Sequence, residues 1–149
     1  MCAALVVVAV AGCGSSSSSS STTSTATFLA EANGACRTAY AKVNALRPAK
    51  AGQETLAETK ANVPKLAVIA QSMLVRLTAL TPPPTLQGEY SRMLAAWRNE
   101  IPIALVGAQA AAAGNKKRDA ETKTEIERLS GEFDDAAGKV GLTVCAGTP

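Results

Sequence analysis

The chain has 149 residues, enough for one domain with an ordinary core. Its 15 Lys and Arg residues are mixed with 12 Asp and Glu residues, and this slight basic excess argues against a nucleic-acid partner. Histidine is absent, which excludes Ser-His-Asp and Cys-His catalysis and removes the commonest ligand of zinc, copper and haem iron. We therefore expect no metal, no cofactor and no enzymatic activity.

The chain starts with an apolar segment, residues 3–12, followed by a cysteine. Its length suits the apolar part of a signal peptide and is too short to span a bilayer. The sequence Val10-Ala11-Gly12-Cys13 resembles the lipobox of bacterial lipoproteins, where small residues precede a cysteine that receives a diacylglyceryl group. The resemblance implies that residues 1–13 are a lipoprotein signal peptide and that Cys13 is lipidated. The alternative is a buried N-terminal strand that ends in cysteine.

The first two residues, Met1 and Cys2, carry no positive side chain, whereas signal peptides normally begin with one. We interpret this as a true translation start that lies further upstream. Lipidation at Cys13 predicts a protein on the extracytoplasmic face of the cell membrane, with the membrane as a partner through the N-terminal lipid.

Residues 14–27, GSSSSSSSTTSTAT, contain no large apolar side chain. Such a segment buries too little surface to offset chain entropy, so we expect a disordered linker. A plain spacer is the simplest interpretation, and an O-glycosylated stalk is the alternative. The linker would separate the lipid anchor from a folded domain over residues 28–149.

From Phe28 onward apolar residues recur at spacings of three, four and seven, which is the period of an amphipathic helix. Four such stripes follow one another along the chain. Their members are Phe28, Ala32, Ala35, Ala39, Val43 and Leu46; Leu56, Val63, Leu66, Ala70, Met73, Leu77 and Leu80; Leu86, Tyr90, Met93, Trp97, Ile101, Ala104 and Ala108; and Ile126, Leu129, Phe133, Ala136 and Val140.

Residues typical of helix ends separate the stripes: Arg47-Pro48, the triple proline 82–84, Gly114-Asn115, and the glycines 138 and 141. Helices joined by short loops pack most simply as an antiparallel four-helix bundle, so the predicted fold class is all-α.

Pro64 and Pro102 lie inside the second and third stripes. Each should kink its helix or mark its true start, because proline lacks the backbone N–H. Kinks in neighbouring helices would open a ligand cavity beside Trp97. A bend that follows the curvature of the bundle is the simpler interpretation.

Two cysteines remain once Cys2 is removed with the signal and Cys13 carries lipid: Cys36 and Cys145. Export places them in an oxidising compartment, where we expect a disulfide that joins the two ends of the domain. A redox pair or a metal pair is the alternative. The segments around Cys36 and Cys145 also resemble uncharacterised secreted or lipidated helical proteins of high-GC Gram-positive bacteria, a group that implies no activity.

Lys116, Lys117 and Arg118 form a basic cluster at the start of the fourth helix, where cations are unfavourable for the helix dipole. They are candidates for contact with an anionic surface, either lipid headgroups or an acidic envelope polymer. Acidic residues follow at once, so an ion-paired, solvated helix face is the simpler interpretation.

Composition does not exclude a carboxylate pair for glycoside hydrolysis. We assign the candidate glutamates to solvated outer helix faces, because most of them alternate with basic residues. They are Glu31, Glu54, Glu58, Glu89 and Glu100.

These features predict a non-enzymatic, membrane-anchored module of the cell envelope that binds an unknown envelope protein or polymer. The alternative is a helical bundle that binds a small ligand in a cavity near Trp97.

Overall fold

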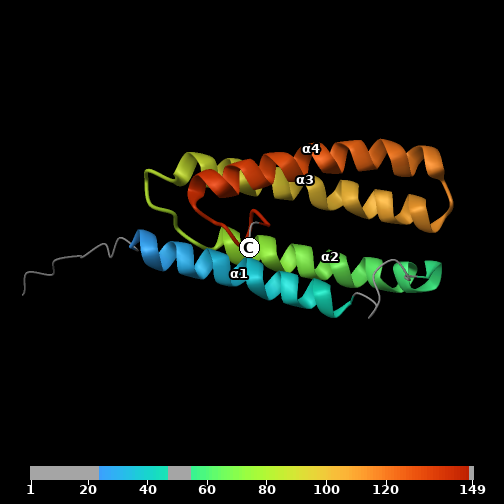
Figure 1. Cartoon of the computed structure of the whole chain (residues 1–149), viewed down its shortest axis with the longest axis horizontal. Helices are drawn as coiled ribbons and strands as arrows, with labels where there is room; N and C mark the ends of the chain where they lie inside the picture. Colours follow the sequence, from blue (N-terminus) through green and yellow to red (C-terminus); the bar gives the residue numbers. More distant parts are fainter. Residues whose placement is uncertain (1–23, 47–54, 148–149) are drawn as a thin grey trace, which may run out of the picture.

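The computed structural model describes residues 24–46 and 55–147. Within these ranges the chain forms four helices: α1 (Thr25–Ala45), α2 (Leu56–Thr78), α3 (Gln87–Ala112) and α4 (Lys116–Val140). They pack antiparallel (Figure 1), so the predicted all-α four-helix bundle is confirmed. Cys13 and the lipobox lie outside the described residues.

The first helix begins earlier than the expected domain start at Phe28. Ser24 has extended backbone angles, and its hydroxyl accepts a hydrogen bond from the backbone N–H of Thr27 at 3.1 Å. A serine at this position satisfies one of the N–H groups that a helix start leaves unpaired. The last residues of the predicted linker therefore form the cap and first turn of α1.

The second helix begins with a reciprocal cap at Thr55. The Thr55 hydroxyl accepts from the backbone N–H of Glu58 at 3.2 Å, and the Glu58 carboxylate accepts from the backbone N–H of Thr55 at 2.7 Å. The helix then continues through Pro64, as α3 continues through Pro102. Neither proline marks a helix start.

Residues that the sequence predicts at helix ends are found in the turn between α3 and α4 and at the end of α4. Gly114 has a φ of 71°, and the Asn115 side chain accepts from the backbone N–H of Arg118 at 3.1 Å. Gly141 ends α4 with a φ of 89°, in the left-handed region that favours glycine.

The helices form two layers, with α3 and α4 in one and α1 and α2 in the other (Figure 1). α2 packs on both α1 and α3, whereas no described Cα atom of α1 lies within 8 Å of one in α4. The segment after α4 turns back along the bundle and meets α1 (Figure 1). This C-terminal segment, residues 141–147, takes the place of a direct contact between α1 and α4.

α3 and α4 approach each other closely at Gly107. A Cβ atom on Gly107 would lie 2.8 Å from the hydroxyl oxygen of Thr122, a distance that real Cβ contacts do not reach. The Thr122 hydroxyl lies 2.9 Å from the carbonyl oxygens of Arg118 and Asp119, to which it donates. The absence of a side chain at Gly107 therefore sets the distance between these two helices.

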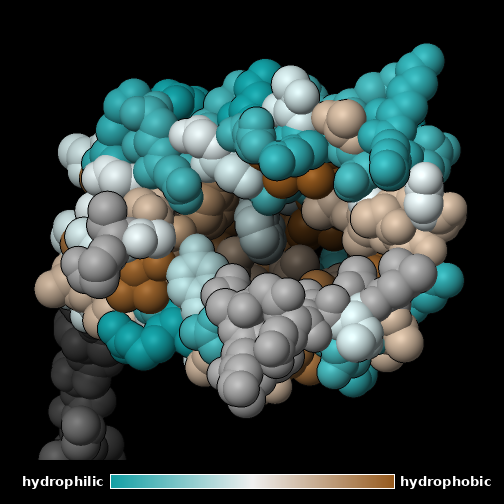
Figure 2. All heavy atoms as spheres, turned by 45° about the vertical axis from the view of Figure 1, so that its right-hand side comes forward, coloured by the Kyte–Doolittle hydropathy of each residue, from teal (hydrophilic) through white to brown (hydrophobic). Residues whose placement is uncertain are grey.

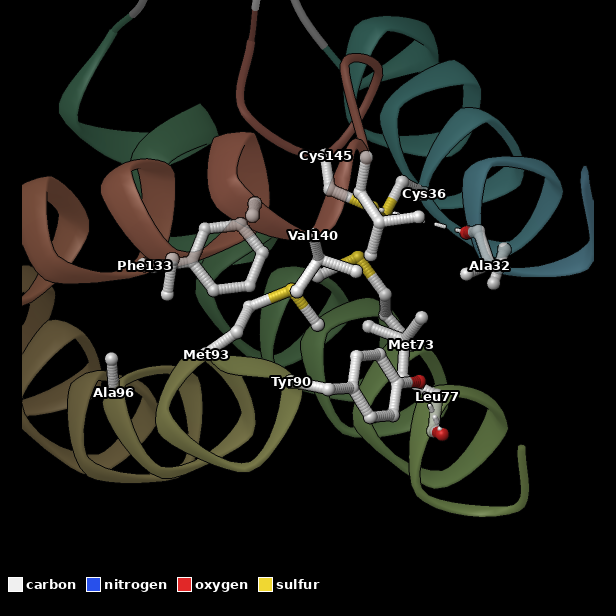
Figure 3. Close-up of a cluster of buried hydrophobic side chains, with 14 of the residues drawn as sticks. Ala32, Cys36, Met73, Leu77, Tyr90, Met93, Ala96, Phe133, Val140 and Cys145 are labelled. Carbon is white, nitrogen blue, oxygen red and sulfur yellow. Dashed lines mark hydrogen bonds between the residues drawn. A yellow bond between two sulfur atoms is a disulfide. The ribbon is translucent and has the colours of Figure 1, made fainter. Parts of the chain in front are cut away.

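The core lies in the half of the bundle that contains the start of α1 and the end of α4. Side chains from all four helices converge there on the C-terminal segment (Figure 3). The ring of Phe28 meets that of Tyr90 edge-on at 5.0 Å, and the Tyr90 hydroxyl donates to the carbonyl of Leu77 at 2.6 Å. This polar atom is thus satisfied inside an otherwise apolar core.

Candidate functional site

The half of the bundle beyond the core contains an apolar pocket of about 210 Å³ between α1, α2 and α3. It is partly open, and the face of the molecule in Figure 2 shows a hollow with apolar residues on its walls. The lining residues are Ala39, Tyr40, Val43, Val63, Leu66, Ala67, Ile69, Ala70, Met73, Trp97, Glu100, Ile101, Ala104, Leu105 and Ala108. None of them belongs to α4.

The C-terminal segment packs in the core next to the pocket, and none of its described residues lines the pocket. Cys145 is joined to Cys36 by a disulfide, and its carbonyl accepts from the Tyr40 hydroxyl at 2.7 Å. Tyr40 therefore lies where the filled core meets the pocket. Beyond it the inward positions on α3 include Ala104 and Ala108, which are too small to fill the space between the helices.

Trp97 forms part of the pocket wall and is held on both sides. Its indole N–H donates to the carbonyl of Ala70 at 3.3 Å, and its ring lies 5.2 Å from that of Phe133. The donor on the indole is satisfied, so the half-buried ring presents mainly apolar surface to the pocket.

Glu100 also lines the pocket, and our assignment of this residue to a solvated face is wrong. Its side chain is 9% exposed. One carboxylate oxygen, Oε1, accepts from the Ser130 hydroxyl at 2.9 Å, whereas Oε2 is buried without a hydrogen-bond partner in the described part of the chain. A buried group left in this way costs about 1–3 kcal/mol, so Glu100 is the one polar feature of the wall that packing does not explain.

The surroundings of Glu100 are acidic. Burial raises the pKa of its carboxyl and the charge of Asp134 raises it further, while the bond from Ser130 lowers it. The pKa of Tyr40 is also raised, by burial first and then by the charges of Asp134 and Glu100. None of the ion pairs among the described residues includes Glu100.

Of the residues predicted to surround a cavity, the structure places only Trp97 on this pocket. Pro64 and Pro102 are exposed and are not among its lining residues. Pro64 instead lines a shallower neighbouring depression of about 480 Å³, which shares Val63 and Leu105 with the pocket. A pocket is present beside Trp97, and its lining includes small side chains such as Ala104 and Ala108.

The spacing of residues along the third stripe indicates that Glu100 faces inward. Met93, Trp97, Glu100 and Ala104 are spaced by four, three and four residues, the same spacing that defines the third stripe. That register places Glu100 on the inward face of α3. Alternation with basic neighbours along the chain was the weaker indicator.

The predicted disulfide between Cys36 and Cys145 is confirmed. The Cα atoms are 5.3 Å apart, and both side chains are fully buried. The second cysteine is held at the α1 surface by a further bond from the backbone N–H of Val144 to the side chain of Asn33, at 3.0 Å. This environment suits a structural bond more than a redox pair.

Lys116, Lys117 and Arg118 are exposed at the first turn of α4, at the end of the bundle opposite Ser24 (Figure 1). Arg118 lies 3.4 Å from Glu121 in an exposed ion pair. A role for the cluster in binding an anionic surface stays a prediction.

The described residues contain no group of three or more acidic or cysteine side chains placed to hold a metal ion. The helices in the described ranges lack the apolar length needed to cross a membrane.

Comparisons with family models, curated proteins and solved structures found no match to this chain.

Proposed function

We propose that this chain is an extracytoplasmic, lipid-anchored binding protein whose helical domain holds a small apolar ligand in the pocket beside Trp97. The observation that carries the proposal is the pocket of about 210 Å³ with an almost wholly apolar wall. An engineered apolar cavity of about 150 Å³ stays dry and binds benzene. A space of this size and chemistry therefore suits a ring or a short alkyl chain, which would gain free energy by leaving water.

Binding fits the residues of the pocket better than catalysis does. Among the described residues that line it, Tyr40 and Glu100 are the titratable ones. The Tyr40 hydroxyl donates to the backbone carbonyl of Cys145, so it is not free to act with Glu100 as an acid–base pair. Apolar surface with one or two polar groups is the usual composition of a ligand pocket.

The proposed location rests on two features. The Val10-Ala11-Gly12-Cys13 sequence resembles a lipobox, and the buried Cys36–Cys145 disulfide is of a kind that persists in oxidising compartments. Together they support a ligand met outside the cytoplasm, with the protein held at the membrane through Cys13.

Trp97 makes the proposal directly testable, because it is the only tryptophan of the chain and it lines the pocket. The full chain carrying Cys13→Ser is titrated with 1-naphthylamine, a small fluorophore that is neutral at neutral pH, and energy transfer from Trp97 is measured. We expect saturable transfer. The Cys13→Ser change removes the acylation site, so that no attached lipid competes.

Ala104→Leu fills the pocket, and Ala95→Leu is its matched control because Ala95 is exposed on the same helix. We expect Ala104→Leu to weaken binding at least about tenfold, since the added methylenes occupy the ligand volume. Ala95→Leu should bind as the parent does. Equal binding by both variants, or no saturable transfer in the parent, would refute the proposed function.

A further inference from the structure

The ion pairs of the bundle lie in one of its two layers. Among the described residues, every ion pair joins side chains of α3 and α4, which together carry eight basic and nine acidic residues. The other layer, α1 and α2, carries five basic and two acidic residues, and none of the five cations forms an ion pair in the described part of the chain. These cations are Arg37, Lys42, Lys60, Lys65 and Arg76. The α1–α2 layer therefore has positive charge that no described acidic side chain pairs with.

Two of these cations line the same shallow groove between α1 and α2. The groove is bordered by Lys42 and Arg76 and by the side chains of Thr38 and Ser72, and it has no acidic side chain among its described lining residues. Each cation lies in the last turn of its helix, where the helix dipole favours it, but the dipole does not account for two cations at one groove. Cations beside hydroxyl groups match a phosphate, which is anionic and accepts hydrogen bonds.

Two exposed valines of α2 lie beside this groove. Val68 and Val75 are 69% and 67% exposed. Ser72, which lines the groove, follows Val68 by four residues and precedes Val75 by three, so the three side chains share one face of the helix. Lys65 precedes Val68 by three residues and adds a cation to that face. Apolar side chains among uncompensated cations are the composition of helices that lie on anionic membranes.

We propose that this face docks on an anionic lipid bilayer, with Lys42, Lys65 and Arg76 against lipid phosphates and Val68 and Val75 among the headgroups. We call these five residues the docking face. A second copy of the chain suits the face less well, since two copies would bring like charges together. A bilayer supplies many phosphates in one plane, and the lipid anchor proposed above would keep the face close to it.

Vesicle co-sedimentation tests the docking with the full chain carrying Cys13→Ser, which has no acylation site. The vesicles are phosphatidylcholine alone, or phosphatidylcholine mixed with phosphatidylglycerol. We expect binding to the mixed vesicles to be at least about tenfold tighter than to phosphatidylcholine alone, and to weaken as salt rises, since ions screen exposed charges. Residues 3–12 are common to every variant, so differences between variants report the docking face. Equal binding to both vesicles, at low and high salt, overturns the proposal.

Lys65→Gln with Arg76→Gln removes two charges from the docking face. Lys116→Gln with Lys117→Gln is its matched control, because it removes two exposed charges from the first turn of α4. We expect the first variant to bind the mixed vesicles about twentyfold more weakly, since each basic residue at an anionic surface contributes about a factor of five. The control should bind as the parent does. An equal loss in both variants, or a larger loss in the control, would mean that the docking face is not the contact.

Val68→Ser with Val75→Ser tests the apolar part of the face, and Val106→Ser on α3 is its control, because Val106 is also exposed. We expect the double variant to lose at least about fivefold in affinity for the mixed vesicles, since valine gains free energy on leaving water, and Val106→Ser to lose none. Unchanged binding by the double variant, or a parent dimer that it dissociates in sedimentation velocity, contradicts membrane docking. The 1-naphthylamine titration measures the pocket separately, so the failure of one proposal leaves the other standing.

Discussion

Glu100 is a buried ionisable residue, and the spacing of the apolar residues along α3 indicates its inward position. It occupies an inward position of α3 and is one of the residues that line the pocket, although it is ionisable. Burial of such a group destabilises its charged form. The raised pKa and the unpaired Oε2 are two consequences of the same position.

The pKa of Glu100 predicts a pH-dependent difference in stability between the protein and Glu100→Gln. Burial raises the pKa of this carboxyl in the folded state above its usual value, so the folded state binds this proton more tightly than the unfolded state does. The resulting stability is present below the unfolded pKa and is lost as pH rises through the folded pKa. Glutamine does not titrate and therefore keeps its stability over the same range.

We expect Glu100→Gln to match the parent at about pH 4 and to exceed it by about 1 kcal/mol at about pH 7. Urea denaturation of both proteins at the two pH values measures the difference. Titrations of groups that do not interact with Glu100, such as Asp135, are common to both proteins and cancel. Glu127→Gln serves as the control and should show no such trend, and a difference independent of pH would contradict the explanation.

Gly107 gives a second prediction at the scale of one residue. Gly107→Ala places a Cβ atom 2.8 Å from the Thr122 hydroxyl oxygen, so the helices must separate or Thr122 must move. We expect a loss of about 1 kcal/mol in the free energy of unfolding, because overpacking outweighs the gain in helix propensity. Thermal or urea denaturation measures it.

Gly131→Ala is the matched control for Gly107→Ala, since a Cβ at Gly131 meets nothing within 4 Å. It should stabilise the protein by about 0.5–1 kcal/mol through helix propensity alone. Thr122→Ala removes the clashing hydroxyl, so Gly107→Ala should become neutral or stabilising in that background. The same cost in both backgrounds would mean that Thr122 is not the obstacle.

At the scale of elements, the spacing of apolar residues predicted the four helices, and residues typical of helix ends predicted where the helices stop. The four apolar stripes correspond to α1 to α4, and the triple proline, Gly114 and Gly141 mark their ends. The start of α1 was placed too late, because Thr25 to Thr27 contain no large apolar side chain and only the Ser24 cap announces the helix. Capping chemistry was the better guide there than hydrophobic period.

The C-terminal segment is the element that periodicity does not describe. It fills the space between α1 and α4 next to the core, with Leu142 and Cys145 fully buried. Two hydrogen bonds hold it to α1, from the backbone N–H of Val144 to Asn33 and from the Tyr40 hydroxyl to the carbonyl of Cys145. Only the cysteine count predicted that this segment returns to α1.

Removal of the disulfide should therefore loosen this element first. The bond joins residues separated by 109 positions, and the loop-entropy model gives about 4–5 kcal/mol for a loop of that size. We expect Cys36→Ala with Cys145→Ala, in the Cys13→Ser background, to lose about 4 kcal/mol in urea denaturation. Hydrogen exchange should be accelerated in residues 141–147 more than in α3, and an unchanged denaturation midpoint would contradict a structural role.

At the scale of the whole molecule, the core and the pocket follow one another along the bundle and share Ala39 and Met73 where they meet. The C-terminal segment closes the half that contains the start of α1, and no equivalent segment among the described residues closes the other half. The N-terminal side of the domain, where Ser24 begins α1, lies at the end opposite the turn between α3 and α4 (Figure 1). A membrane anchor upstream of Ser24 would therefore join the bundle at its well-packed end.

The proposed anchor predicts the distribution of the whole protein between membrane and soluble fractions. Cys13→Ser should release it, because an attached diacylglyceryl group contributes about 0.8 kcal/mol for each buried CH₂ and two chains are enough for stable anchoring. Fractionation of the producing bacterium with an antibody to the folded domain measures the change. Membrane-bound Cys13→Ser would contradict lipidation at this residue, and Cys2→Ser is the matched control.

The amino-acid sequence by itself determined the four helices, their antiparallel order and the pairing of Cys36 with Cys145. These depend on a period of 3.6 residues, on caps and on a count of cysteines, all of which are legible along the chain. Tertiary structure alone decided where the pocket lies and that Glu100 is buried beside it. A cavity depends on the distances between helices and on the side chains that meet there, and no local pattern contains those distances.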